Sequence, residues 1–210
     1  MKTTNKELMA QARAALKNNW KLAVTTIALV TLIKFVSQAI PGLRVVLPML
    51  IAGPLALGVS VFALSLSRGT EAKLKQVFEG FERFGTALAT YLLSVLFIIL
   101  WALLLIIPGI IAALSYSQIY FILADNPDIG PMEAIDRSKK MMIGNKWKFF
   151  CLGWRFFGWM ILSVLTLGIG FLWLMPYMTV TFAKFYDDVK DGGDDEVVEV
   201  IEIVETVTTE

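Results

Sequence analysis

Two basic residues lie within apolar stretches of this 210-residue chain and have the clearest chemical potential in it. Arg155 falls in the stretch 149–167 and Lys34 in the stretch 22–40, neither of which contains an acidic residue. A cation at the centre of a bilayer costs about 2.5–3.5 kcal/mol unless a partner stabilises it. A guanidinium binds phosphate through two parallel hydrogen bonds, so Arg155 is a candidate for binding a lipid headgroup. The alternative is that both side chains extend to the membrane surface without a specific partner.

Uncharged polar residues in the same kind of stretch form a second group of candidates. Gln38 shares a helical face with Lys34 and Thr31, and Ser115 forms a polar face with Gln118 in the stretch 110–124. Two interpretations fit these faces equally well: they line a small polar path, or they form hydrogen bonds between neighbouring helices.

The paired acids Asp125 and Asp128 are weak candidates for metal binding or acid–base catalysis. They stand in ADNPDIGPMEA, 124–134, where Asn-Pro and Gly-Pro are typical of turns and helix starts. The chain has no histidine and one cysteine, Cys151, so it offers no Cys/His cluster with metal-ligand spacing. Intramembrane enzymes use histidine, paired acids or a Ser/Lys pair, and no phosphate-binding loop is present. We therefore predict a non-enzymatic protein with no catalytic residue, no metal and no cofactor.

The elements that would position these candidates are predicted to be membrane-spanning helices. Hydrophobic residues make up 57% of the chain and its mean hydropathy is +0.68. An apolar run of about 20 residues spans a bilayer core. Such runs, free of Asp, Glu and His, cover 22–40, 45–66, 88–107, 110–124, 149–167 and 171–186, the fourth and sixth being short. The predicted fold is all-α: a polytopic membrane helix bundle with six transmembrane helices.

Turn signals and charge predict how these helices are connected. Tight hairpins are expected at Ile40-Pro41-Gly42, at Pro108-Gly109 and at Gly168-Ile169-Gly170. Lysine and arginine concentrate in the N-terminal arm and in the connections 67–87 and 125–148. By the positive-inside rule, both termini and both long connections face the cytoplasm.

Each hairpin is preceded by a charged amphipathic stretch, which predicts three repeats, about 7–66, 71–124 and 131–186. The segment KNNWKLAV, 17–24, parallels GNKWKFFC, 144–151. In the second repeat an interfacial helix is expected over 71–84, supported by the pairs Glu71–Lys75 and Glu79–Arg83, and the third repeat offers Glu133–Arg137 and Asp136–Lys140. The sequence is consistent with two roles for these helices, simple anchoring to the membrane and lipid sensing. Their predicted inner-leaflet contacts are Lys73, Lys75, Arg83, Lys139, Lys140, Lys146 and Lys148.

The final segment, 187–210, is acidic and matches neither a helix nor a strand period, which predicts a solvated, disordered cytoplasmic tail after a membrane domain at 1–186. The alternatives are docking onto the basic loops of the protein itself and adding a strand to a protein partner.

Three blocks of sequence resemble a known family. YFILADNPDIGPMEAIDRSKKMMIGNKWKFF at 120–150, LLIIPGIIAALSY at 104–116 and LTLGIGFLWLMPYMTVTFAKFY at 165–186 are similar to the bacterial, mainly Gram-positive, membrane family called domain of unknown function 975. That family is distantly similar to the membrane domain of some glycerophosphodiester phosphodiesterases. The resemblance implies a multi-pass plasma-membrane protein in a lipid-related setting. It implies no activity, because the phosphodiesterase domain is absent here.

Two functions follow as expectations. The first is a non-enzymatic envelope module that binds phospholipid headgroups, anionic ones in particular, or scaffolds a protein partner through its acidic tail. The second is a small transporter or export subunit with a path between the three repeats. Nothing in the sequence indicates nucleic acid binding, and the oligomeric state is left open.

Overall fold

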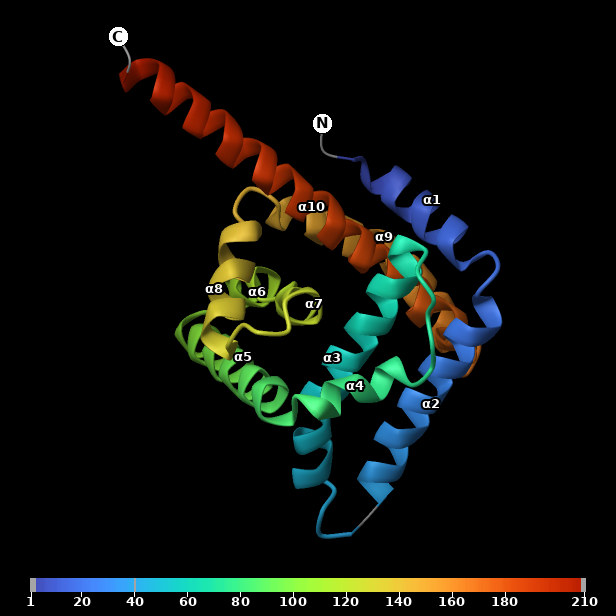
Figure 1. Cartoon of the computed structure of the whole chain (residues 1–210). Helices are drawn as coiled ribbons and strands as arrows, with labels where there is room; N and C mark the ends of the chain where they lie inside the picture. The colour runs from blue at the N-terminus through green and yellow to red at the C-terminus, as the bar shows by residue number, and fades with distance from the viewer. Residues whose placement is uncertain (1–2, 40, 209–210) are drawn as a thin grey trace.

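The computed structural model describes residues 3–39 and 41–208, with backbone alone for 191–208, and its elements over these ranges are all α-helices (Figure 1). This confirms the predicted all-α class. In chain order the helices are α1 Asn5–Leu16, α2 Trp20–Ala39, α3 Val46–Arg68, α4 Gln76–Glu82, α5 Phe84–Leu104, α6 Ile106–Ser115, α7 Ile119–Asp125, α8 Pro131–Met141, α9 Lys146–Leu165 and α10 Phe171–Thr208.

Five helical segments in the described ranges are long and apolar enough to cross a membrane, with mean hydropathies from 1.3 to 2.5. They are Trp20–Ala39, Val46–Arg68, Phe84–Leu104, Ile106–Asp125 and Lys146–Leu165. Such segments are typical of a multi-pass membrane protein. The sixth predicted stretch, 171–186, forms the start of α10 and is not among the five, so a count of six spans stays a prediction.

The second helix of each hairpin lies inside the bundle and the first lies outside. Within an apolar window of 18 residues in each segment, the protein buries 56% of the residues in α3 and 50% in the α6–α7 segment, but only 28% in α2 and 17% each in α5 and α9. In α10, Val180, Ala183 and Tyr186 are fully buried. Large apolar side chains on the outer helices are exposed, which is the pattern expected of a surface covered by lipid.

The short helices that precede the three hairpins, α1, α4 and α8, each pack against an inner helix. Helix α4 crosses α3 so closely that a side chain added at Gly58 would overlap the carbonyl of Val77. Helix α8 joins α6 through Ser138, whose hydroxyl donates to the carbonyl of Ser115 at 2.7 Å. Helix α1 lies beside α10 (Figure 1), and the Tyr177 hydroxyl donates to the Met9 carbonyl at 3.2 Å.

Two hairpin turns fall where the glycines predicted them, and one is displaced. Gly42 and Gly168 adopt φ values of 83° and 87°, which favour glycine; Ile40 lies outside the described residues. The middle reversal occurs at Leu105, and α6 begins at Ile106, so the turn predicted at Pro108-Gly109 is wrong. The physical reason is that proline is tolerated in the first turn of a helix, where backbone N–H groups have no partner.

The predicted helix over 71–84 is shorter than expected, because α4 covers only Gln76–Glu82. Neither pair predicted there is present among the described contacts. Glu71 pairs with Lys73 at 3.0 Å, and Arg83 donates to the carbonyls of Leu123 and Pro127 at 2.9 and 3.0 Å. In α8 both predicted pairs are confirmed, Glu133–Arg137 at 2.7 Å and Asp136–Lys140 at 3.4 Å.

The boundary predicted at residue 187 falls inside α10, which continues to Thr208. Val189 is only 3% exposed and belongs to an apolar cluster with Leu8 and Phe185, so residues up to Lys190 pack as part of the bundle. Disorder of the acidic segment stays a prediction for the residues after Lys190; of these, 209–210 lie outside the described residues.

Candidate functional site

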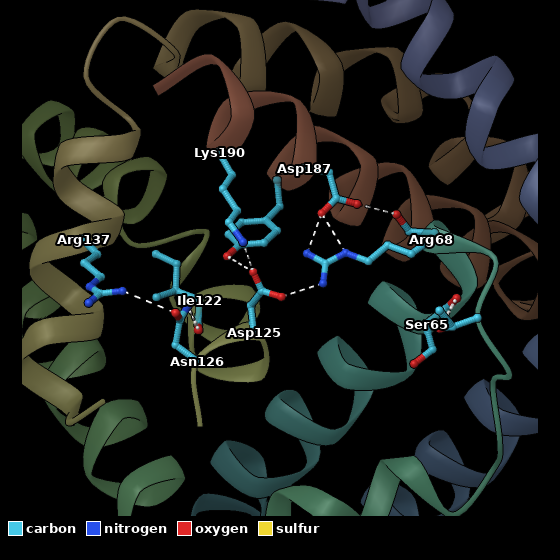
Figure 2. Close-up of polar contacts among 11 residues, drawn as sticks. Ser65, Arg68, Ile122, Asp125, Asn126, Arg137, Asp187 and Lys190 are labelled. Carbon is cyan, nitrogen blue, oxygen red and sulfur yellow. Dashed lines mark hydrogen bonds and ion pairs between the residues drawn. The ribbon is translucent and has the colours of Figure 1, made fainter. Parts of the chain in front are cut away.

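Residues of the three inner segments meet in one charged cluster, formed by Arg68 at the end of α3, Asp125 at the end of α7 and, within α10, Asp187 with Lys190 (Figure 2). Arg68 Nη1 lies 2.5 Å from Asp125 Oδ1, and Arg68 Nη2 lies 2.7 Å from Asp187 Oδ1. Lys190 Nζ lies 2.5 Å from Asp125 Oδ2. Two carboxylates and two cations thus neutralise one another where α3 and α7 end beside α10.

Hydroxyl groups complete this cluster. Tyr186 donates to Asp125 Oδ2 at 3.1 Å, and Ser67 donates to Asp187 Oδ2 at 2.9 Å. The Asp125 side chain is 10% exposed and that of Arg68 is 37% exposed, so solvent reaches one side of the network. Because every carboxylate oxygen already accepts a bond, we interpret the cluster as a connector of the inner helices rather than a ligand site.

A second charged group attaches the N-terminal helix. Lys148 Nζ lies 2.6 Å from Asp188 Oδ2, and the backbone N–H of Thr3 donates to Asp188 Oδ1 at 2.7 Å. Burial alone would raise the pKa of Asp188, but the bonds from Lys148 and Thr3 outweigh burial and hold that pKa below its ordinary value. Lys148, predicted as a lipid contact, therefore has a partner within the protein.

A polar break separates α6 from α7 at residues 116–118. The Gln118 side chain is fully buried; its Nε2 donates to Ser117 Oγ at 3.0 Å, while its Oε1 has no hydrogen-bond partner among the described residues. A buried acceptor without a partner is uncommon and points to strain or to a function. The predicted polar face of Ser115 and Gln118 therefore lies at an interruption of an inner helix.

A cavity of about 560 Å³ opens beside this break. The Lys139 Nζ stands 5.8 Å from the centres of the Tyr116 and Phe97 rings, a cation–π distance. Neither Lys139 nor Lys146 forms an ion pair in the part of the chain that the structure describes. Two basic side chains therefore stand at an apolar cavity with no acid to neutralise them. The lining residues are Trp101, Pro108, Ile111, Ala112, Ser115, Tyr116, Lys139, Ile143 and Lys146.

The remaining predicted site residues do not gather at this cavity. Arg155 on α9, and Lys34 and Gln38 on α2, are exposed, and no described ion pair or hydrogen bond of their side chains joins them to one another or to Ser115. Their exposed positions fit the interpretation that they extend to the membrane surface. Of the other predicted inner-leaflet contacts, Lys73 and Lys140 pair with acids, Arg83 binds carbonyl oxygens, and Lys75 is exposed.

Sequence reasoning missed the charged cluster and the aromatic part of the cavity. Arg68, Asp125 and Asp187 each lie within two residues of the end of the second apolar stretch of a hairpin. Three charged residues at matching positions of three predicted repeats were a signal that they could meet. For Trp101 and Tyr116 the sequence carried no such signal, because aromatic residues are common at membrane interfaces.

The fold and the site define a multi-pass, all-helical membrane protein. The chain matches the family described as "Protein of unknown function (DUF975)" over residues 1–115 and 103–192, and it belongs to that family. This confirms the resemblance found in the sequence. No curated protein and no solved structure matches the chain, and the similarity to the membrane domain of glycerophosphodiester phosphodiesterases stays a prediction.

Proposed function

We propose that this protein is a non-enzymatic membrane protein that binds the headgroup of an anionic phospholipid at the cavity between α5, α6 and α8. The single observation that carries the proposal is the pair Lys139 and Lys146 at the mouth of a cavity whose walls include Trp101, Ile111 and Ile143. A phospholipid combines the two properties that this site complements, a negative phosphate and an apolar chain.

The membrane setting of the proposal is a plasma membrane crossed six times, with both termini in the cytoplasm. The order of helices supports three units, each made of a short helix, an outer helix and an inner helix, with α10 supplying the sixth span. In this orientation α1 and α8, the two short helices that carry Lys and Arg, meet the cytoplasmic leaflet, whose negative potential favours each nearby Lys or Arg by about 1 kcal/mol.

The proposal is tested by counting bound lipids. The purified protein is moved into nanodiscs of phosphatidylglycerol mixed with phosphatidylcholine and then released for native mass spectrometry. We expect retained phosphatidylglycerol, and a loss of about tenfold in apparent affinity in Lys139→Gln with Lys146→Gln, equivalent to about 1.4 kcal/mol. Lys75→Gln is the matched control, since it removes a charge from an exposed side chain without a described partner. Equal retention in both variants would reject this site.

A transport role is the second candidate, and the interruption of the inner helices favours it. Pro54 lies inside α3, Pro176 lies inside α10, and residues 116–118 separate α6 from α7. Discontinuous helices frame the substrate sites of many transporters. Solute flux into sealed vesicles, abolished by Gln118→Leu, would support this role, and the absence of flux over a broad panel of small solutes would reject it.

A further inference from the structure

A second cavity, of about 460 Å³, lies between the α1–α2 corner and the α9–α10 hairpin, and nothing described so far uses it. Among the described residues that line it, Arg13 of α1 is the only charged one, and three are tryptophans. The full lining consists of Arg13, Trp20, Trp159, Leu162, Ser163, Thr166, Gly170, Trp173, Leu174 and Tyr177.

This cavity is built in the same way as the cavity at Lys139. In each, a cation from a short helix stands over a tyrosine of an inner helix: Arg13 Cζ is 5.7 Å from the Tyr177 ring centre, and Lys139 Nζ is 5.8 Å from that of Tyr116. In each, a glycine after the hairpin turn packs against a small residue of the outer helix.

The close approach of a glycine to the backbone of the outer helix makes the similarity between the two cavities specific. A Cβ built at Gly109 would lie 2.8 Å from the Cα of Ala102, and one built at Gly170 would lie 2.8 Å from the Cα of Ser163. The same number of residues separates Gly109 from Gly170, Ala102 from Ser163, and Tyr116 from Tyr177. The two cavities therefore occupy corresponding positions in two successive hairpins.

The hydroxyl groups of the second cavity are all bonded within the protein, which leaves Arg13 as the charged donor for a ligand. The Ser163 hydroxyl donates to the Trp159 carbonyl at 2.8 Å, and the Tyr177 hydroxyl donates to the Met9 carbonyl. The Thr166 hydroxyl donates to the Ser163 carbonyl and accepts from the Gly170 N–H. Arg13 forms no ion pair in the described part of the chain, and no acidic residue lines the cavity. An exposed guanidinium with free donors favours a phosphate, which it binds in a bidentate manner.

We infer that this cavity is a second anionic-phospholipid site, with the phosphate on Arg13 and an acyl chain against Trp159, Trp173 and Leu174. The choice of an anionic phospholipid as ligand rests on the proposed function of the cavity at Lys139. The existence of the second site is argued from its own lining residues. The third junction, between α4 and α3, is closed by the contact of Gly58 with Val77, and no described cation lies over an aromatic ring there. The expected stoichiometry is therefore two lipids per chain.

The test counts phosphatidylglycerol molecules retained by the full chain in native mass spectrometry after release from the mixed nanodiscs. Wild type should retain two and Arg13→Gln one. Lys139→Gln with Lys146→Gln should retain one, and the combined variant none. Inorganic phosphate in excess distinguishes a headgroup site from a site for free phosphate, because only the second should lose its lipid to phosphate.

Two controls separate lipid binding from docking of α1. Arg13→Lys keeps the charge and should retain the second lipid with about tenfold weaker apparent affinity, which a purely structural role for Arg13 would not produce. Tyr177→Phe removes the bond to Met9 while keeping the ring, and should retain both lipids. Two lipids in Arg13→Gln would overturn the second site. One lipid in Arg13→Gln beside two in Lys139→Gln with Lys146→Gln would support the second site and reject the proposed function of the cavity at Lys139.

Discussion

The inner and outer helices of this bundle differ in regularity as well as in burial. Each inner segment contains a proline or a break: Pro54 lies inside α3, Pro176 lies inside α10, and residues 116–118 separate α6 from α7. The outer helices α2, α5 and α9 contain no proline. An interruption frees backbone N–H and C=O groups, and lipid has no partner to offer them. Irregular backbone is therefore placed where other helices surround it.

Glycine shows the same difference between the two layers. Gly58 of α3 meets the Val77 carbonyl, whereas Gly158 of α9 has nothing within reach of an added Cβ. The first glycine permits two helices to touch, and the second is a weak point in an exposed helix. The inner layer is thus constrained by shape, while the outer layer is constrained mainly by its affinity for lipid.

The largest effect should come from adding a methyl group to the inner layer. We expect Gly58→Ala to destabilise the protein by about 3 kcal/mol or to prevent folding, since the backbone of α4 must move away from α3. Gly158→Ala should be neutral or stabilising by up to about 1 kcal/mol, because alanine favours a helix. Thermal unfolding in detergent, followed by circular dichroism, measures both. Similar losses in the two variants would contradict the distinction between the layers.

An intermediate effect should follow from removing the charge that joins the inner helices. Asp125→Asn leaves Arg68 and Lys190 with only one carboxylate between them, and we expect a loss of about 2 kcal/mol, reduced from the value for a buried pair because solvent reaches the cluster. The neighbouring Asp128→Asn is the control, since Asp128 is exposed. Unfolding by urea in mild detergent compares the two variants. Equal unfolding midpoints would show that the cluster does not hold the helices together.

The smallest effect should be a pH dependence confined to α1. The folded-state pKa of Asp188 lies below the unfolded value of about 3.9, so its bonds stabilise α1 docking fully above that pH and lose this effect as the pH falls through the folded pKa. Hydrogen exchange of residues 5–16 should therefore be slow at about pH 6 and accelerate, beyond the intrinsic change, below about pH 4. In Asp188→Asn the protection at about pH 6 should be weaker and the pH step smaller; an unchanged profile would rule out this attachment.

Hydrophobicity and turn residues predicted the elements of this fold because they act locally. The apolar stretches, the α8 ion pairs and the glycine turns at Gly42 and Gly168 all depend on residues close in sequence. The turn at Leu105 is displaced for a local reason, since Pro108 is tolerated in the first turn of α6. The carbonyl partners of Arg83 lie far along the chain, where a single sequence does not reveal them.

The candidate site was predictable in its parts but not in its assembly. Ser115, Lys139 and Lys146 were each recognisable as polar or basic residues near a membrane. Their grouping around one cavity requires α8 to lie against α6, a contact fixed by the bond from Ser138 to the Ser115 carbonyl. Arg155 seemed the stronger candidate from the sequence, since burial depth along a helix does not reveal which way the side chain faces.

The docking of α1 against α10 sets an order for the assembly of the protein. Thr3 and Met9 bind to residues Asp188 and Tyr177 near the other end of the chain, so α1 has no permanent place until α10 has been synthesised. At 5–20 residues per second, that delay is roughly 10–40 s. Helix α4, in contrast, can join α3 almost as soon as it leaves the ribosome. Helix α1 is therefore made well before it is positioned, and during translation Lys6 and Arg13 are free to rest on the membrane surface.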